Sequence, residues 1–254
     1  MTDTVTAAML AIGDELLSGR TKDKNIGHLA SILTAVGIDL KEVRIVADEE
    51  DDIVDALNAL RNRYDYVFTS GGIGPTHDDI TADAISKAFG LPCEHDAAAM
   101  KLLGDSYAAR NVDFNETRQR MARMPRGATH IPNSVSVAPG FVIENVHVMA
   151  GVPSVFEVMV DAVLPTLRTG AKLQSIAIPC DFGEGMIGIP LRDIQKAHPD
   201  TIIGSYPKMV EGRYAVELIV RAREQDKLEL AADAVRLMLT ELDKQRREAE
   251  TPAG

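Results

Sequence analysis

The stretch SGGIGPTHDDIT, residues 70–81, combines three glycines, a proline and two adjacent aspartates in twelve positions. Gly71, Gly72 and Gly74 can expose backbone N–H groups just before a helix, and such donors suit a phosphate or a pyrophosphate. The loop lacks the Lys-Ser/Thr pair of a P-loop, and His77 takes the place of the third glycine of the dinucleotide-binding fingerprint. The sequence therefore supports neither a P-loop ATPase nor a Rossmann dehydrogenase.

Aspartates in a phosphate-binding loop repel the ligand unless a cation lies between them. Asp79 closes the loop, Asp48 is expected at the carboxyl end of a neighbouring strand, and Asp14 and Glu15 follow the first strand. Carboxylates that converge on phosphate oxygens can hold Mg²⁺ or a similar hard cation, which would polarise a water for attack. The alternative is that these acids cap helices, since Thr76 and Asp79 fit a capping box and Asp48 also fits a helix start. Both interpretations stay open.

Other polar residues of these loops are candidates for proton transfer and ligand binding. His77 is suited to proton transfer near neutral pH, although it could equally pack against neighbours or meet solvent. Asp78 is interpreted as a residue that favours the amino end of the helix. Arg20 and Asn25 could reach an anionic ligand from the first loop. The rest of the expected ligand-binding set consists of Pro75, Thr76, Asn133, Gly151, Pro153 and Ser154.

The elements that must position these residues follow a repeating pattern. Apolar runs of strand length at 7–13, 40–46 and 66–70 alternate with segments of helical spacing. This order indicates right-handed βαβ units and a parallel sheet with helices on both faces. Ligands of such sheets lie at the carboxyl ends of the strands, which is where the glycine loop falls. Residues 146–154 predict a further strand that is followed by the turn GVPS.

The chain of 254 residues has room for two modest domains. RTGAK, at 168–172, is a candidate linker because the charge balance changes there. Residues 1–170 hold 15 Lys and Arg against 24 Asp and Glu, whereas residues 171–254 hold 12 against 14. The order strand, helix, two strands and helix predicts a small α+β domain at 171–248, and we expect 249–254 to be a frayed tail.

Bulk composition excludes several classes of protein. The net charge of −11 disfavours general affinity for nucleic acid or an anionic membrane. The amino terminus has no basic-then-apolar leader, and no window approaches the roughly 18 apolar residues of a membrane span, so we expect a cytoplasmic protein with no membrane partner. Cys93 and Cys180 stand outside any C-x-x-C pair, which argues against a zinc knuckle or a disulfide framework.

Five separated motifs, AIGDELLSG, KDKN, SGGIGPTHDDIT, NSVSVAPGF and AGVPSVFEVM, closely resemble in order and spacing the amino-terminal portion of the CinA family of competence/damage-inducible proteins. The resemblance covers residues 1–168. It implies the three-layer α/β fold of molybdopterin-binding-like domains, shared with MogA, MoaB, the last part of MoeA and the front half of eukaryotic FAD synthase. Residues 182–208 resemble the KH-like domain that follows in CinA proteins. The amidase domain that often completes them is not expected, so no nicotinamide mononucleotide deamidase activity is inferred.

The resemblance also implies an activity. In MogA-like relatives the functional acids are the aspartate that closes the glycine loop and the one after the second strand, which are Asp79 and Asp48 here. In CinA-like relatives the implied activity is hydrolysis of the pyrophosphate in ADP-ribose or FAD with Mg²⁺, Mn²⁺ or Co²⁺, with K⁺ as an additional ion. The expected metal ligands are then Asp79, Asp48, Glu15 and Asp14. Relatives also suggest a homo-oligomer.

Three alternative functions remain, and one residue departs from the family pattern. The first alternative is a protein that binds molybdopterin or takes part in molybdenum-cofactor biosynthesis without hydrolysis, and another is a catalytically silent scaffold. GMIG at 185–188 offers the G-x-x-G of a KH loop, but Asp181 and Glu184 flank it, so nucleic acid is not expected as a partner.

CinA-like sequences usually read NPxGTAPGF, whereas Ser136 here replaces the glycine and adds a Cβ where backbone could approach the ligand.

Overall fold

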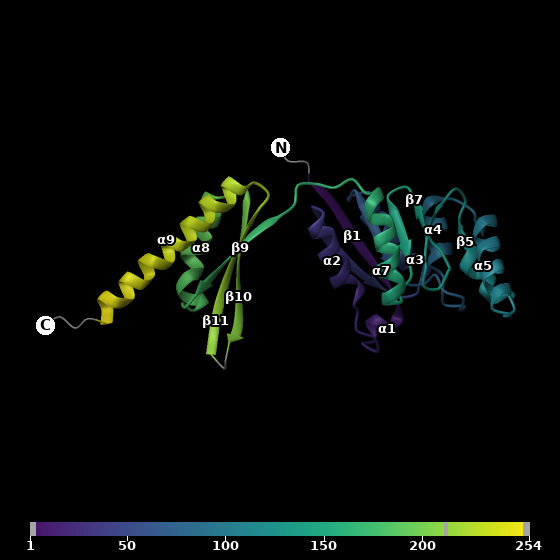
Figure 1. The fold of residues 1–254 in the computed structure, drawn as a ribbon, viewed down its shortest axis with the longest axis horizontal. Helices are drawn as coiled ribbons and strands as arrows, with labels where there is room; N and C mark the ends of the chain where they lie inside the picture. Colours follow the sequence, from purple (N-terminus) through teal and green to yellow (C-terminus); the bar gives the residue numbers. More distant parts are fainter. Residues whose placement is uncertain (1–3, 211–212, 251–254) are drawn as a thin grey trace. The chain divides into compact units, whose positions relative to one another are not determined.

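The computed structural model describes residues 4–210 and 213–250, and the chain divides into two compact units between Gly170 and Ala171 (Figure 1). The strands of the main sheet in the first unit are β1 (Val5–Ile12), β2 (Ile38–Val46), β3 (Tyr66–Ser70), β6 (Thr129–Ile131), β7 (Gly140–Ile143) and β8 (Val146–Met149). They lie in the order β2-β1-β3-β8-β7-β6. The first four in this order run parallel, and β7 and β6 are added by antiparallel pairing. The mostly parallel sheet expected from the βαβ pattern is confirmed.

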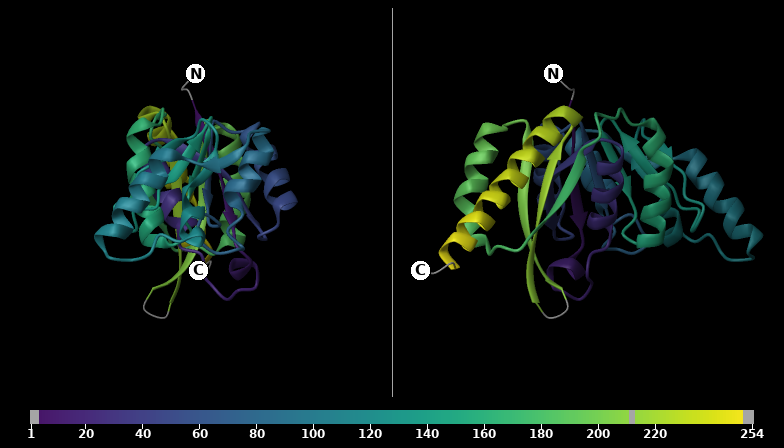
Figure 2. Two further views of the ribbon diagram at one scale, coloured as in Figure 1. Left: turned by 90° about the vertical axis from the view of Figure 1, so that its right-hand side faces the viewer. Right: turned by 60° about the vertical axis from the view of Figure 1, so that its left-hand side comes forward.

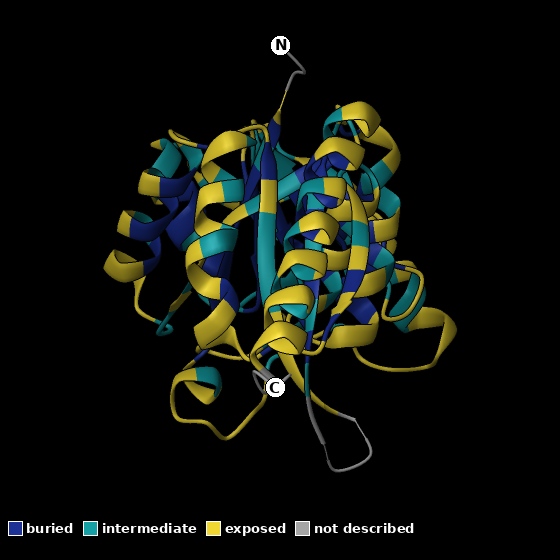
Figure 3. Ribbon diagram, turned by 90° about the vertical axis from the view of Figure 1, so that its left-hand side faces the viewer, coloured by how far each residue is buried: buried dark blue, intermediate teal, exposed yellow. Residues whose placement is uncertain are grey.

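Helices cover both faces of this sheet. They are α1 (Asp14–Leu17), α2 (Asn25–Ala35), α3 (Glu50–Arg61), α4 (Thr81–Phe89), α5 (Ala97–Ala109), α6 (Glu116–Gln119) and α7 (Pro153–Val163). Two 3₁₀ turns, η1 (Arg120–Ala122) and η2 (Leu164–Thr166), and a small antiparallel pair, β4 (Cys93–His95) with β5 (Arg123–Pro125), complete the unit. The longer helices α2, α3, α4, α5 and α7 each have a buried side and an exposed side, whereas the short helices α1 and α6 have no buried residues (Figure 3).

The central strand β1 shows why the fold has three layers. Met9 packs in one core cluster with α2 and α7, whereas Leu10 packs in a second cluster with α3, α4 and α5. Both side chains are fully buried. A strand that buries both faces must be apolar at every position, as the run at 7–13 is. The predicted three-layer α/β class is therefore confirmed.

The second unit is a small α+β structure. Its elements are β9 (Gln174–Cys180), α8 (Glu184–Ala197), β10 (Thr201–Val210), β11 (Arg213–Ala222) and α9 (Gln225–Glu250). The strands form an antiparallel sheet in the order β10-β11-β9, and the long strands β10 and β11 run side by side (Figure 2). Leu218 and Val235 lie in the core that α8 and α9 form on one face of this sheet. The KH-like relationship stays a prediction.

The final helix α9 extends to Glu250, so residues 249 and 250, expected to be frayed, are helical, and residues 251–254 lie outside the described residues. Its apolar stripe includes the buried residues Leu228 and Val235, as the predicted spacing of three and four requires. In the part of the chain that the structure describes, no helix is both long enough and apolar enough to cross a bilayer.

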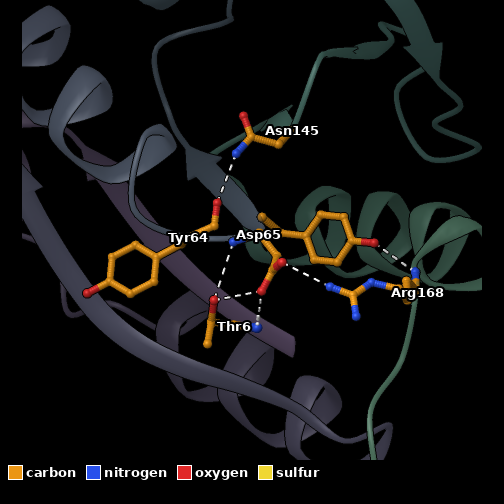
Figure 4. A network of polar contacts seen from close by, with 6 residues as sticks. Thr6, Tyr64, Asp65, Asn145 and Arg168 are labelled. Atoms are coloured by element: carbon orange, nitrogen blue, oxygen red, sulfur yellow. Dashed lines mark hydrogen bonds and ion pairs between the residues drawn. The ribbon is translucent and has the colours of Figure 1, made fainter. Parts of the chain in front are cut away.

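A cluster of polar contacts holds the amino-terminal ends of β1 and β3 together (Figure 4). Asp65 Oδ2 accepts hydrogen bonds from the backbone N and the hydroxyl of Thr6, each at 2.8 Å. Arg168 Nη2 lies 2.9 Å from Asp65 Oδ1, and the Arg168 backbone N donates to the Tyr66 hydroxyl at 2.7 Å. Burial raises the pKa of Asp65, but the bonds from Thr6 and Arg168 outweigh it and hold the pKa below its ordinary value. This cluster joins Arg168, near the end of the first unit, to the amino-terminal ends of β1 and β3.

A buried histidine lies in the middle of the sheet on β8. The His147 ring is stacked on Phe68 with the centroids 5.1 Å apart, and Tyr66 meets it edge-on at 5.7 Å. Its Nδ1 has no hydrogen-bond partner among the described residues. Burial disfavours the imidazolium and lowers the pKa of His147 from 6.5 to about 4. The folded protein therefore keeps this ring neutral.

We expect Asp65→Ala to lower the free energy of unfolding by about 1–2 kcal/mol, because three donors on Thr6 and Arg168 lose a charged acceptor. Urea denaturation at neutral pH measures this. Asp55→Ala, at an exposed position of α3, is the matched control and should stay near wild type. Equal midpoints for the two variants would show that the cluster contributes no stability.

The buried His147 predicts a pH dependence of stability. The unfolded chain takes up a proton near pH 6.5, whereas the folded chain resists until about pH 4, so stability is complete above pH 7 and falls as pH decreases through this window. The contribution lost between pH 7.5 and 5 is about 2 kcal/mol. His147→Phe, which keeps a ring on Phe68, should remove this part of the pH dependence. The exposed-site control His95→Phe should retain it, and identical pH profiles for all three proteins would refute the assignment.

Candidate functional site

The loops at the carboxyl edge of the first sheet surround one large cavity. The parallel strands β2, β1, β3 and β8 all end at this edge, and the 132–139 connection from β6 to β7 lies there too because β7 runs opposite to β8. The cavity has a volume of about 760 Å³, and its lining includes Glu15, Asp48, Asp78 and Asp79. A second cavity of about 550 Å³ lies beside it and shares Glu15, Asp48 and Asp78.

The glycine loop passes so close to other backbone that side chains are excluded. A Cβ on Gly71 would lie 2.2 Å from the carbonyl oxygen of Ile12, and one on Gly72 would lie 2.1 Å from Thr81 Oγ1. Both glycines have positive φ, at 109° and 68°, which other residues rarely adopt. The N–H groups of Gly72 and Ile73 donate to no acceptor in the described part of the protein. The loop therefore offers free amides at the edge of the cavity, as an anion requires.

Asp79 is bonded to its own loop. Its Oδ1 accepts from the Gly74 N–H at 2.7 Å, and its Oδ2 accepts from the Thr76 N–H at 2.7 Å and the Thr76 hydroxyl at 2.5 Å. Arg120 Nη2 donates to the Asp79 carbonyl at 3.1 Å. Helix α4 begins at Thr81 with no side-chain cap, so the Thr76–Asp79 pair closes the loop ahead of the helix and does not cap it. Asp79 fixes the loop's shape.

Asp48 and Asp78 face the space between the two cavities. Asp48 Oδ2 accepts from the Asp14 N–H at 3.0 Å. Burial raises the pKa of Asp48, the bond from Asp14 opposes this, and the carboxylates of Asp14, Glu15 and Asp78 raise it further. Asp78 lines both cavities, a position that sequence reasoning missed. The spacing of Thr76 and Asp79 indicated that these two residues interact, but no signal in the sequence placed Asp78 at the cavities.

The expected metal ligands are not preassembled. Within residues 4–210 and 213–250, no three Asp, Glu, His or Cys side chains lie close enough together to hold a metal ion. Asp48, Asp78 and Glu15 still line the same space. Such a set fits a cation of the Mg²⁺ type, which is commonly bound by one or two carboxylates plus the phosphates of its ligand. It does not fit a metal held by protein alone.

The remaining predicted residues divide between the cavities, the scaffold and the solvent. Those that line the large cavity are Gly71, Gly72, Gly74, Pro75, Asn133, Gly151, Pro153 and Ser154, and Arg20 and Asp14 line the smaller one. Asn25 is buried, and its Nδ2 donates to Ser70 Oγ at 2.7 Å and to the Gly151 carbonyl at 2.8 Å. It therefore joins the ends of β3 and β8. His77 has a side chain 99% exposed and lines neither cavity.

Comparison with known proteins gives two family matches. Residues 8–169 match the model of a probable molybdopterin binding domain, and residues 172–247 match the middle domain of FAD synthase. A protein of Pyrobaculum calidifontis is 33% identical over 256 residues, which cover 94% of this chain and 96% of the relative. A protein of Aeropyrum pernix is 31% identical over 260 residues, which cover 98% and 95%.

A solved structure agrees with the first match. The crystal structure of the protein CinA from Thermoplasma acidophilum, described as of unknown function, superposes with a TM-score of 0.61 at 29% identity. The match covers 65% of this chain and 99% of the other. The resemblance to the amino-terminal region of CinA is therefore confirmed.

The loop that carries Ser136 is organised by a single asparagine. Asn133 Oδ1 accepts from the N–H groups of Val135 at 2.9 Å and Ser136 at 3.1 Å, and Asn133 Nδ2 donates to Ser136 Oγ at 2.6 Å. Ser136 is exposed and lines the large cavity. The left-handed residue of this loop is Val137, with φ 72°. For a β-branched residue that conformation is a rare outlier.

We expect Val137→Gly to stabilise the protein modestly. Release from the left-handed region is worth about 1–2 kcal/mol, and the greater freedom of glycine in the unfolded chain offsets about 0.5–1 kcal/mol of that. Val135→Gly, two residues away and outside the left-handed region, should instead lose stability. Chemical denaturation of both variants measures whether the free energy of unfolding rises or falls relative to wild type. A loss in Val137→Gly as large as in Val135→Gly would show that the loop stores no strain.

Proposed function

The chain belongs to the family of probable molybdopterin binding domains, and from that premise we propose that its first unit is a nucleotide pyrophosphatase that requires a divalent metal ion. The substrate is ADP-ribose, FAD or a related dinucleotide. The observation that carries this proposal is the juxtaposition of the free Gly72 and Ile73 amides with Asp48 and Asp78 around one cavity. Amides bind phosphate, and the carboxylates demand a cation beside it.

The glycine loop is proposed to hold one phosphate of the pyrophosphate. Its Gly72 and Ile73 N–H groups point to no internal acceptor among the described residues, so they are available to phosphate oxygens. Asp79 contributes by position, because its bonds to Gly74 and Thr76 fix the curvature of the loop. Asn25 contributes in the same way by joining β3 to the Gly151 turn.

The carboxylates are proposed to hold the cation together with the ligand. Asp48, Asp78 and Glu15, with Asp14 beside them, would supply one or two oxygens, and phosphate oxygens would supply others. When bound, the ion neutralises charge on the phosphates and lowers the pKa of a water. This arrangement explains why the acids lie around a shared space without forming a closed cluster.

Binding of molybdopterin without hydrolysis is the second candidate, and the family match favours it. The phosphate of the pterin would occupy the same loop amides. The match of residues 172–247 to the middle domain of FAD synthase supports FAD as a candidate ligand. A nucleotide or pterin is therefore the proposed class of partner, and a homo-oligomer remains part of the proposal.

We expect the protein to release AMP from ADP-ribose or FAD in the presence of Mg²⁺, Mn²⁺ or Co²⁺ and not in EDTA, as separated by chromatography. Asp48→Asn should lower kcat/KM by about 100-fold or more, because the cation loses a charged ligand next to the phosphate. The matched control Asp55→Asn, on the exposed face of α3, should keep full activity.

Full turnover by Asp48→Asn, or equal turnover in EDTA, would refute the metal-dependent mechanism. An inactive wild-type protein that copurifies with a fluorescent pterin would instead establish the second candidate.

A further inference from the structure

The order of the strands determines where the acids, the glycine loop and the other loops of the large cavity lie along the carboxyl edge of the sheet. The acids Glu15 and Asp48 follow β1 and β2, the glycine loop follows β3, and the 150–155 turn and the 132–139 loop follow β8 and β6. Because the sheet order is β2-β1-β3-β8-β7-β6, the acids occupy one end of the cavity and the last two loops the other. The glycine loop lies between the two ends.

The end away from the acids presents two exposed aliphatic side chains. Val135 is 54% exposed and Val152 is 59% exposed, and both line the large cavity. Each carries a hydroxyl neighbour that lines the same cavity, Ser136 in one loop and Ser154 in the other. This end therefore combines apolar surface with groups that can donate and accept hydrogen bonds.

Both valines are held on fixed backbone. The Val135 N–H is bonded to Asn133 Oδ1 at 2.9 Å. The Val152 carbonyl accepts from the N–H groups of Val155 and Phe156 in the first turn of α7 at 3.0 and 2.9 Å. Apolar side chains that are exposed in a cavity and preorganised in this way lose little freedom when a ligand covers them.

The opposite end is mostly polar. The smaller cavity shares Glu15, Asp48 and Asp78 with the large one and adds Asp14, Ser18, Arg20 and one exposed aliphatic side chain, Leu17. A ligand whose pyrophosphate lies on the glycine loop would thus meet carboxylates on one side and valines on the other. The valine side presents two aliphatic side chains and no carboxylate, so it can replace the hydration of an apolar ring face more favourably than Leu17, which lies among the acids.

We propose that Val135 and Val152 are specificity-determining residues that hold the planar heteroaromatic ring of a nucleotide, with Ser136 and Ser154 placed for the polar edge of that ring. The rest of the ligand runs over the glycine loop toward Asp48. This inference rests on the proposed function, because it takes a phosphate on the glycine loop as its fixed point.

The experiment uses two probes that share a ribose and its 5-phosphate. AMP also carries the adenine base, whereas ribose 5-phosphate has no base. Isothermal titration of the full chain with Mg²⁺ gives the Kd of each probe, and competition with inorganic pyrophosphate reports whether the phosphate site is used. The test variant is Val135→Ser with Val152→Ser, and the matched control is Val112→Ser, an exposed valine outside both cavities.

We expect wild type to bind AMP about tenfold or more tightly than ribose 5-phosphate, since burial of the base and of two valine side chains contributes binding free energy of that order. The double variant should lose this advantage and keep its Kd for ribose 5-phosphate, and Val112→Ser should match wild type. Thermal melting of each variant establishes that it is folded.

An unchanged Kd for AMP in the folded double variant, with both probes displaced by pyrophosphate, would overturn the assignment of the valines and leave the proposed function intact. The assignment would also be overturned if wild type bound the two probes equally. Failure of wild type to bind either probe would overturn the phosphate site and the valine assignment together.

Discussion

Contact of backbone against backbone at the carboxyl edge of the first sheet is the constraint on which the site depends. The position of a Cβ on Gly71 would be 2.2 Å from the Ile12 carbonyl oxygen, and one on Gly151 would be 3.3 Å from the Gly71 Cα. The ends of β1 and β3 therefore meet only because Gly71 carries no side chain, and a side chain at Gly151 would be a tight fit against Gly71. Asn25 secures the same junction with bonds to Ser70 and Gly151.

The parallel sheet then converts chain order into spatial order. Each βαβ unit places its loop at the same edge, so loops distant in sequence become neighbours in the order of their strands. Loops after β2 and β1 carry acids, the loop after β3 carries free amides, and the loop after β8 carries Val152. A ligand with a charged part and an apolar part can therefore contact the acids, the amides and Val152 in only one orientation.

Sequence patterns predicted the parts of this arrangement that depend on local composition. The continuous apolar run of β1 and its alternation with helical segments predicted the parallel sheet, and the glycines predicted the tight loop at the end of β3. Strands β6 and β7 were missed, because each is only three or four residues long and lies in a segment rich in proline, glycine and asparagine. The left-handed residue of the 132–139 loop was also missed, because the family pattern departs at Ser136 whereas the positive φ belongs to Val137. Both errors concern contacts between residues that no periodicity encodes.

The paired aspartates of the glycine loop show how a carboxylate can lie beside a phosphate site without repelling the ligand. Asp79 has its charge satisfied by the N–H groups of Gly74 and Thr76 and by the Thr76 hydroxyl, so it acts as part of the loop. Asp78 interacts with the Thr76 side chain and with its own backbone, which lowers its pKa, and it lines both cavities together with Asp48. The two adjacent aspartates therefore differ in role, because Asp79 holds the Gly74 and Thr76 amides and, of the two cavities, lines only the large one. The charge left facing the cavity is the one that a cation must balance before a phosphate can approach, and this links the shape of the loop to the proposed requirement for metal.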